Sequence, residues 1–310
     1  ATEPGLNHPD GLDCHLTLLE KLFKRVRQAN LKLSPTKCNL FKTEVDYLGF
    51  NFSKDGLRIS SKNVRKIKEL KPPKSKRQVR SFLGATGYVR RAIPGYAHIA
   101  NPLTQLTKDD IRFVWGKDQQ KAFALLVQTI TSEPCIVYPD YSQRFLLFCD
   151  ASDFCIGACL AQTRESVLKP IGYFSRTLSR TQLAWPIVDK VGLSIIEALG
   201  NWRSMLMLSE VTVYTDNMAA KYILMSDRQS TARRAKLVAH FSEYENVTLQ
   251  HIAGSKNQLA DFLSRIHGPF EDDDTEPPQA QPIPDDPNPE NRVISKMIAM
   301  ISNNSRAQPI

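Results

Sequence analysis

The sequence predicts an α/β protein of two modules, on three observations. Its 310 residues exceed the roughly 100–200 residues of one ordinary domain. Over residues 13–134, short runs of strand character give way to helical periodicity, which predicts an α+β module with a helical second half. From residue 143, three strand-like runs come first and strands then alternate with helices. This order predicts a mixed sheet with helices packed on it.

In the first module, residues 13–30 carry apolar side chains at helical spacing, and Asp13 is a candidate N-cap. Three runs of strand character follow, Leu31–Leu33, Val45–Phe52 and Leu57–Ile59. The Asp55-Gly56 step between the last two runs predicts a hairpin. A basic helix is expected after Lys71-Pro72-Pro73, and a further helix over Asp118–Ile130.

In the second module, the segments RFLLFCDAS, IGACLAQ, KPIGYFS, VTVYTD and VTLQHIAG are expected to form strands. Helices are expected over Ile187–Trp202, Met218–Met225, Thr231–Tyr244 and Gln258–Arg265. The predicted organisation is a flexible segment 1–12, a first module 13–134, a second 135–268 and a tail 269–310. The tail is acidic, rich in proline and without periodicity, so it is expected to be disordered.

Composition indicates a soluble globular chain, with 42% hydrophobic and 24% charged residues and no apolar stretch of membrane-spanning length. The first residues have no apolar core of a signal peptide, so no membrane partner and an excised chain are expected. The six cysteines form no paired CxxC motif. The three within FLLFCDASDFCIGACL are expected to be small buried residues in a reducing compartment.

The charge is unevenly distributed. From Phe270 onward, eight acidic residues oppose three basic ones, a net charge of −5. The remaining 38 basic and 24 acidic residues give the rest of the chain +14. Such a bias favours a polyanionic partner, most commonly nucleic acid, although it also serves general solubility.

Three aspartates lie at the ends of predicted elements in the second module. Asp150 and Asp216 each end a strand, and Asp261 lies in the helix after the last strand. Carboxylates gathered at strand ends can hold two Mg²⁺ ions about 3.5–4 Å apart, which suits phosphodiester cleavage. The alternative is three unrelated solvated aspartates, since polar residues commonly end strands.

The runs CDASDFCIGACLAQ, KPIGYFSRTLS, YTDNMAAKYIL and HIAGSKNQLADFLSR together resemble the ribonuclease H domain in Pol polyproteins of Ty3/gypsy-type LTR retrotransposons. KLSPTKCNLFKTEVDYLGF resembles the end of the reverse transcriptase palm with its primer-grip hairpin. PPKSKRQVRSFLGATGYVRRAIPGYAHIANPLTQLT resembles the thumb and connection. The resemblance covers about residues 13–266, and its motifs follow the order of the family.

The resemblance implies a helical thumb in the first module and a ribonuclease H-like mixed five-stranded sheet in the second. It implies Mg²⁺-dependent hydrolysis of the RNA strand of RNA–DNA hybrids, with Asp150, Asp216 and Asp261 as catalytic metal ligands. The implied partners are an RNA–DNA hybrid and the rest of the Pol polyprotein, and no feature of the sequence indicates an oligomeric state. The implied setting is intracellular, in the cytoplasm within virus-like particles of the parent element, or in the nucleus.

The same resemblance assigns nucleic-acid contacts. The candidates on the thumb are Lys74, Lys76, Arg77, Arg80, Arg90 and Arg91, whose alternative is a solvated basic helix face. Ser81, Gly84 and Gly87 would allow that helix to approach a duplex closely. Asn217 would position substrate or cap the following helix. Ser175-Arg176 and Arg233-Arg234 are candidate backbone contacts, the segment 45–49 is the candidate primer grip, and His251 is given no catalytic role.

Two features depart from the family. No YxDD motif occurs, so the chain is not expected to polymerise by itself, and no zinc-binding HHCC module or integrase core follows Arg265. The family's fourth carboxylate, a helix glutamate, is replaced by Val191, and neither Asp189 nor Glu197 lies on the same helix face. Beside Val191, Gly192 weakens the helix by about 0.5–1 kcal/mol relative to alanine. Losing one carboxylate weakens binding of the second ion, so strongly reduced or absent hydrolysis is expected.

Three hypotheses therefore stand. The first is a hydrolase that works with three aspartates. The second is the same fold with a degraded site that grips nucleic acid without cleaving it. The third is a host-adopted protein whose acidic tail recruits a partner.

Overall fold

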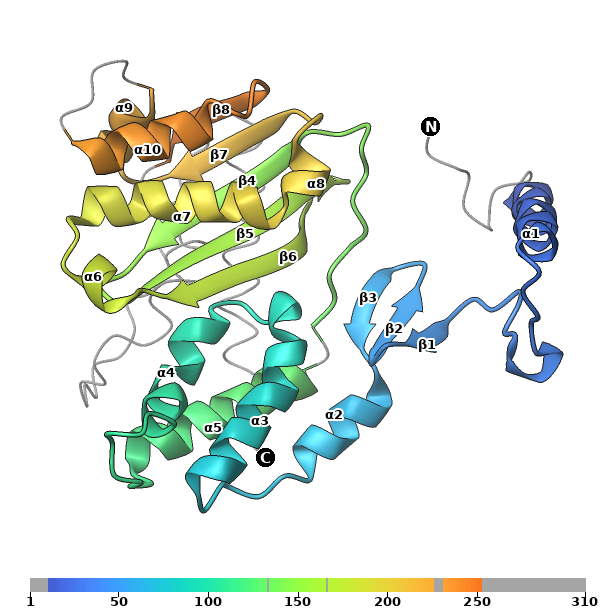
Figure 1. Cartoon of the computed structure of the whole chain (residues 1–310), viewed down its shortest axis with the longest axis horizontal. Coiled ribbons are helices and arrows are strands. Elements are labelled where there is room, and N and C mark those ends of the chain that lie inside the picture. The colour runs from blue at the N-terminus through green and yellow to red at the C-terminus, as the bar shows by residue number, and fades with distance from the viewer. Residues whose placement is uncertain (1–10, 133, 166, 226–230, 253–310) are drawn as a thin grey trace.

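The computed structural model describes residues 11–132, 134–165, 167–225 and 231–252 (Figure 1). A three-stranded antiparallel sheet and a group of helices form the first half, and a five-stranded mixed sheet with helices forms the second. The predicted α/β class is confirmed. No helix within the described ranges is long and apolar enough to cross a lipid bilayer.

Helix α1 (Gly11–Gln28) stands clear of the other elements in Figure 1. The prediction that Asp13 is its N-cap is wrong, because the helix begins two residues earlier and Asp13 lies in the first turn. A carboxylate there still interacts favourably with the helix dipole. Leu22 and Phe23 are exposed on this helix. A short 3-10 turn, η1 (Pro35–Lys37), follows, and residues 31–33 form no strand, contrary to the prediction.

The small sheet consists of β1 (Val45–Tyr47), β2 (Phe50–Ser53) and β3 (Gly56–Ile59), in that order. The run 45–52, predicted as one strand, folds back on itself between Tyr47 and Phe50. Leu48 and Gly49 between them have φ of 47° and 76°, the two positive values that a tight hairpin turn requires. The predicted hairpin at Asp55-Gly56 is confirmed, with Gly56 paired to Ser53.

The helices of the first half are α2 (Ser61–Lys68), α3 (Lys76–Tyr88), α4 (Tyr96–Leu106) and α5 (Lys117–Thr131), with the 3-10 turn η2 (Arg90–Ala92). The basic helix expected after Pro73 is α3, and Ser75 caps it by accepting a hydrogen bond from the backbone N–H of Gln78. Val79 and Phe82 on α3 pack with Leu126 of α5 in the core of this half.

The large sheet contains β4 (Phe145–Ala151), β5 (Cys155–Arg164), β6 (Val167–Thr177), β7 (Val211–Thr215) and β8 (Val247–His251). Their spatial order is β6-β5-β4-β7-β8. The first three strands along the chain are antiparallel neighbours, whereas β4, β7 and β8 run parallel. This mixed sheet has the five strands that the sequence predicted.

The second half also contains α6 (Arg180–Leu183), α7 (Ile187–Asn201), α8 (Arg203–Leu206), α9 (Met218–Leu224) and α10 (Ala232–Phe241). In Figure 1, α7 crosses one face of the sheet, where its Ile195 packs with Leu147 of β4. Phe148 and Tyr214 belong to a separate cluster on the other face. The predicted helix Gln258–Arg265 and the acidic tail lie outside the described residues.

The two halves meet where α4 and η2 pack against β6. The backbone N–H of Ala97 donates to Ser175 Oγ at 2.9 Å, and the guanidinium of Arg90 donates to the carbonyl of Ser175. Ile136 packs in the first core and Val137 against the second, so the chain passes between the cores here. The residue boundaries proposed for the modules remain predictions.

The expectation that three cysteines are buried is confirmed, and it leads to a chemical prediction. Burial raises the pKa of the Cys155 thiol to about 11, and burial also raises the pKa values of Cys149 and Cys159. Cys38, in contrast, is exposed. Because the thiolate is the nucleophile, iodoacetamide at pH 8 should alkylate Cys38 and spare these three in the native protein. Peptide mass spectrometry measures this, with urea-unfolded protein as the control, and equal alkylation of all four before unfolding would contradict the described burial.

Candidate metal centre and nucleic-acid interface

Asp150 lies near the carboxyl end of β4, and Asp216 directly follows the end of the neighbouring parallel strand β7. Phe148 of β4 is in register with Tyr214 of β7, and their rings stack with centroids 5.1 Å apart. Asp150 comes two residues after Phe148 on β4 and therefore lies on the same face of the sheet, and Asp216 is the first residue after β7. Adjacent strands are about 4.8 Å apart, a spacing that allows two carboxylates to share a cation.

The surroundings of Asp150 favour a buried polar site. Asp150 is 5% exposed, and its cross-strand partner on β5 is Gly157, which has no side chain to crowd the carboxylate. Asp216 is half-buried just beyond the end of β7. The carboxylate pair fits a hard divalent cation, for which oxygen is the preferred ligand.

The third predicted ligand, Asp261, lies outside the described residues. Within the described ranges, no group of three histidine, cysteine, aspartate or glutamate side chains is close enough to hold a metal ion. The three-aspartate site therefore remains a prediction, and the structure describes two of its members, at the ends of neighbouring parallel strands.

Val191 occupies the predicted position of the missing glutamate, and its side chain is enclosed. It lies on α7, is 1% exposed, and belongs to the apolar cluster between this helix and the sheet. Ile195, one turn later, lies in the same cluster. At this position the chain thus supplies packing to the core and no oxygen ligand.

The two nearest acidic side chains on α7 are held elsewhere. Asp189 accepts from Arg233 Nη1 at 2.7 Å and from Arg234 Nε at 2.8 Å, which ties α7 to α10. Glu197 accepts from Arg176 on β6 at 2.7 and 3.1 Å. Both carboxylates are engaged by arginines, in agreement with the expectation that neither replaces the absent glutamate.

A lysine and a histidine donate hydrogen bonds to backbone carbonyls close in sequence to the two aspartates. Lys190 is buried, and its ammonium donates to the carbonyl of Asp153 at 2.9 Å, in the turn that follows β4. His251, at the end of β8, donates from Nε2 to the backbone carbonyl of Asp216 at 3.1 Å. No sequence pattern places His251 here, because only the β7–β8 register, which pairs it with Thr215, brings it to this edge.

The six basic residues predicted to contact nucleic acid divide into two groups. Four of them make contacts within the protein. Lys76 donates to the carbonyl of Lys108, Arg80 pairs with Asp109 at 3.0 Å, Arg90 bonds to Ser175, and the Arg91 guanidinium lies 4.4 Å from the centre of the Phe50 ring. Lys74 and Arg77 are exposed, and no side-chain partner for either is found within the described ranges.

A basic surface on α2 was missed by the sequence reasoning. Its cations are exposed and continue toward the start of α3: Lys62, Arg65, Lys66, Lys68, Lys71, Lys74 and Arg77. Ile67 is the one buried residue of α2. So narrow an apolar stripe on a helix rich in cations indicates an exposed basic face, and this pattern could have revealed the surface. On α3, a Cβ added to Gly84 would meet no atom within 4 Å, so packing inside this chain does not require glycine there.

Other candidate contacts have structural roles. Asn217 Oδ1 accepts from the backbone N–H of Ala220 at 2.9 Å, so Asn217 caps α9, the second of its two predicted roles. Arg176 is bound to Glu197, and Arg233 with Arg234 to Asp189, as described above. Their contact with nucleic acid remains a prediction.

The predicted primer grip forms β1 and the turn into β2. Tyr88 of α3 donates to the carbonyl of Leu48 at 2.6 Å, which ties this turn to the helix. A cavity of about 240 Å³ opens beside it, lined by Tyr47, Leu48, Phe50, Phe52, Tyr88 and Arg91. The turn therefore presents exposed aromatic rings beside an arginine.

Comparison with known proteins agrees with this architecture. Residues 115–213 match the family described as "RNase H-like domain found in reverse transcriptase". The Tf2-3 and Tf2-4 transposon polyproteins of Schizosaccharomyces pombe (strain 972 / ATCC 24843) are 30% identical over 266 residues, 85% of this chain. The chain spans 20% of the length of these polyproteins.

Two solved structures share the fold. The foamy viral protease-reverse transcriptase in complex with RNA/DNA hybrid superposes with a TM-score of 0.67 at 21% identity, covering 86% of this chain and 36% of that one. The foamy viral protease-reverse transcriptase dRH in complex with ds DNA gives a TM-score of 0.65, also at 21% identity, covering 78% and 43%.

Residues 115–213 thus match a ribonuclease H-like domain of the kind found in reverse transcriptases. Over 85% of its length the chain is similar to transposon polyproteins, and both likenesses agree with the resemblance described above.

Proposed function

We propose that this chain binds an RNA–DNA hybrid and hydrolyses its RNA strand slowly with Mg²⁺, because the site keeps its aspartates but lacks the helix glutamate. The observation that carries the proposal is the contrast between Asp150 and Asp216, at the ends of neighbouring parallel strands, and Val191, enclosed in the core. In the cell this activity would serve the parent Pol polyprotein, in the cytoplasm or the nucleus.

Charge and shape support binding of the hybrid. The exposed cations of α2 and the start of α3 can neutralise phosphates, and this contact does not depend on base sequence. Gly84 leaves the surface of α3 open to close approach. The foamy viral structure in complex with RNA/DNA hybrid has the same fold, which is consistent with this ligand class.

Asp150, Asp216 and, by prediction, Asp261 would hold the cation. Bound Mg²⁺ would supply positive charge that polarises the phosphodiester and lowers the pKa of the attacking water. The chain itself fixes Asp150 within β4 and Asp216 directly after β7, and the His251 ring donates to the Asp216 carbonyl. With valine at position 191, the site has one anionic ligand fewer with which to bind two divalent cations. Hydrolysis should therefore be slow.

Hydrolysis is tested with a labelled RNA–DNA hybrid and Mg²⁺ or Mn²⁺, comparing the chain with Asp216→Asn. We expect weak RNA cleavage that Asp216→Asn abolishes while binding of the hybrid persists. Rapid cleavage by the unmodified chain would favour the second candidate, an enzyme for which three aspartates suffice. Cleavage that survives Asp216→Asn would show that the proposed site is not the source, and absence of hybrid binding would refute the proposal as a whole.

A second prediction separates the two groups of cations. We expect Lys74→Gln with Arg77→Gln to weaken hybrid binding and to reduce the slope of log K against log salt by about 0.9 per lost phosphate contact. The matched change, Lys76→Gln with Arg80→Gln, removes the same charge from side chains that hold the loop around Asp109. It should change that slope less and lower thermal stability more. Equal slopes for both doubles would show that intramolecular contacts do not distinguish the two groups.

A further inference from the structure

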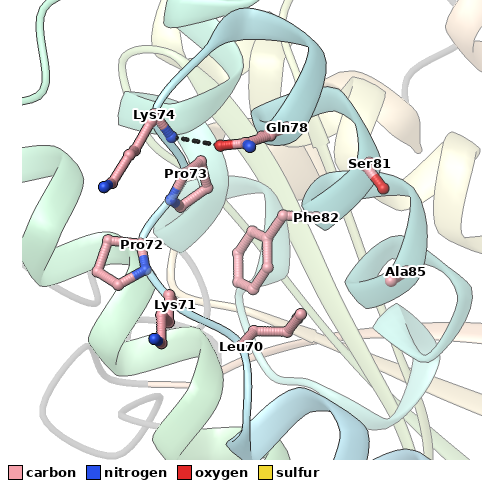
Figure 2. Close-up of a pocket in the computed structure, with 9 residues that line it drawn as sticks. All are labelled: Leu70, Lys71, Pro72, Pro73, Lys74, Gln78, Ser81, Phe82 and Ala85. Atoms are coloured by element: carbon pink, nitrogen blue, oxygen red, sulfur yellow. Dashed lines mark hydrogen bonds between the residues drawn. The ribbon is translucent and has the colours of Figure 1, made fainter.

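A cavity of about 520 Å³ lies between the segment that joins α2 to α3 and helix α3 itself (Figure 2). Leu70, Pro72, Pro73, Phe82 and Ala85 give it an apolar lining. Figure 2 shows the Phe82 ring directed into the space between the segment and the helix. Its volume is in the range that binds a few side chains of a peptide or a small ligand.

Cations surround this apolar floor. Lys71 and Lys74 belong to the lining, and Lys68 and Arg77 flank it in sequence, all of them exposed. Glu69 is the one acidic residue between positions 56 and 108, so the local charge is strongly positive. A hydrogen bond of 2.6 Å from the Lys74 backbone N–H to Gln78 Oε1 holds the segment to α3, so the cavity has a fixed wall.

An occupant should therefore combine an apolar group with several negative charges. The chain's own tail has this composition, because Pro269-Phe270 is followed at once by Glu271-Asp272-Asp273-Asp274 and then by Glu276-Pro277-Pro278. We propose that this acidic segment, residues 269–278, docks in the cavity with Phe270 on the apolar floor and its carboxylates against the surrounding lysines. It would then compete with nucleic acid for the basic surface.

The connection is long enough. Eighteen residues lead from Ile252, the last described residue, to Phe270, and at about 3.3–3.6 Å per residue they span up to about 60 Å. A compact body of this size has a radius of gyration of roughly 18 Å. The tail can therefore reach the cavity within one molecule, where its effective concentration is in the millimolar range and weak contacts suffice.

The competition with nucleic acid rests on the proposed function, but the docking itself does not. Docking is measured with a fluorescein-labelled peptide of residues 268–279 and the full chain in which the tail is neutralised by Glu271→Gln, Asp272→Asn, Asp273→Asn, Asp274→Asn and Glu276→Gln. We expect saturable binding by anisotropy, weakened about tenfold by Phe270→Ala in the peptide and also by Lys71→Gln with Lys74→Gln in the chain. The control, Lys169→Gln with Lys236→Gln, removes the same charge from exposed positions on β6 and α10 and should leave binding unchanged.

Competition is measured as hybrid affinity at fixed salt. The neutralised tail should raise the affinity about three- to tenfold, independently of protein concentration. Peptide binding that is absent, or that both lysine doubles reduce equally, would overturn the proposed docking. A gain in affinity that grows with protein concentration would assign the tail to a second copy and also overturn it. Peptide binding with no hybrid binding by either chain would uphold the docking and refute the proposed function.

Discussion

Substitution of Val191 by glutamate should raise Mg²⁺-dependent cleavage of the RNA strand by about 10²-fold or more. The change places a carboxylate at the helix position that the resemblance assigns to the fourth carboxylate of the metal site. Electrostatic groups that act directly on the reacting phosphate contribute on the order of 10²–10³ in rate, and a second cation bound through the new oxygen would act in this way. The measurement is single-turnover cleavage of a labelled hybrid, with the hybrid's affinity determined separately.

The same substitution should destabilise the fold. Val191 is 1% exposed and packs in the apolar cluster of α7, so an ionised side chain there must reach out toward the aspartates or remain buried. Burial of a polar group without a full set of partners costs about 1–3 kcal/mol. We therefore expect a lower Tm without Mg²⁺ and a partial recovery with it, because a bound ion stabilises the native state.

Val191→Gln is the matched control, since it has nearly the shape of glutamate but no negative charge. It should lower Tm in a similar way and leave cleavage slow. The double variant Val191→Glu with Asp216→Asn should be inactive. If Val191→Glu folds and binds the hybrid but cleaves no faster than the unmodified chain, the missing glutamate does not limit this site.

The fold was largely predictable because its signals are local. The continuous apolar run of β4 and the periodicity of α7 each determine an element without knowledge of the rest of the chain. The run 45–52 was wrongly predicted as one strand because its turn contains Leu48, a non-glycine residue with positive φ. Nothing in the composition of the run indicates such a turn. The N-cap prediction at Asp13 was wrong for a different reason. The residue at which a helix begins is defined only to within one or two positions, and this helix begins at Gly11.

The site was predictable only in part, because its chemistry depends on contacts between distant segments. Asp150 and Asp216 could be found from strand ends alone. The position of His251 beside the Asp216 carbonyl requires the strand order, and sequence reasoning set this residue aside. Equally, no local pattern distinguishes Arg80, which is paired with Asp109, from Arg77, which is not.

Replacement of Asp189 by alanine should reduce the free energy of unfolding by about 3 kcal/mol. Asp189 is 3% exposed and bridges two arginines of α10, and the Arg233 guanidinium also lies 4.4 Å from the centre of the Trp185 ring. Removing one member of a buried pair typically costs 3–5 kcal/mol. The lower end applies here because Arg233 and Arg234 are 39% and 26% exposed, so water can solvate them once the carboxylate is gone. Urea unfolding gives the measurement, with an unchanged m value expected.

Glu210→Ala is the matched control, because it removes one carboxylate from the exposed pair that Glu210 forms with Arg144. Such pairs contribute less than about 1 kcal/mol, so its unfolding midpoint should barely move. The unfolding midpoint of Asp189→Asn should lie between those of the two alanine variants, because the amide keeps the shape and one acceptor but loses the charge. If Asp189→Ala unfolds at the same urea concentration as Glu210→Ala, the arginine bridge does not hold α10 to α7. The stability of this half would then come from the apolar cluster around Val191.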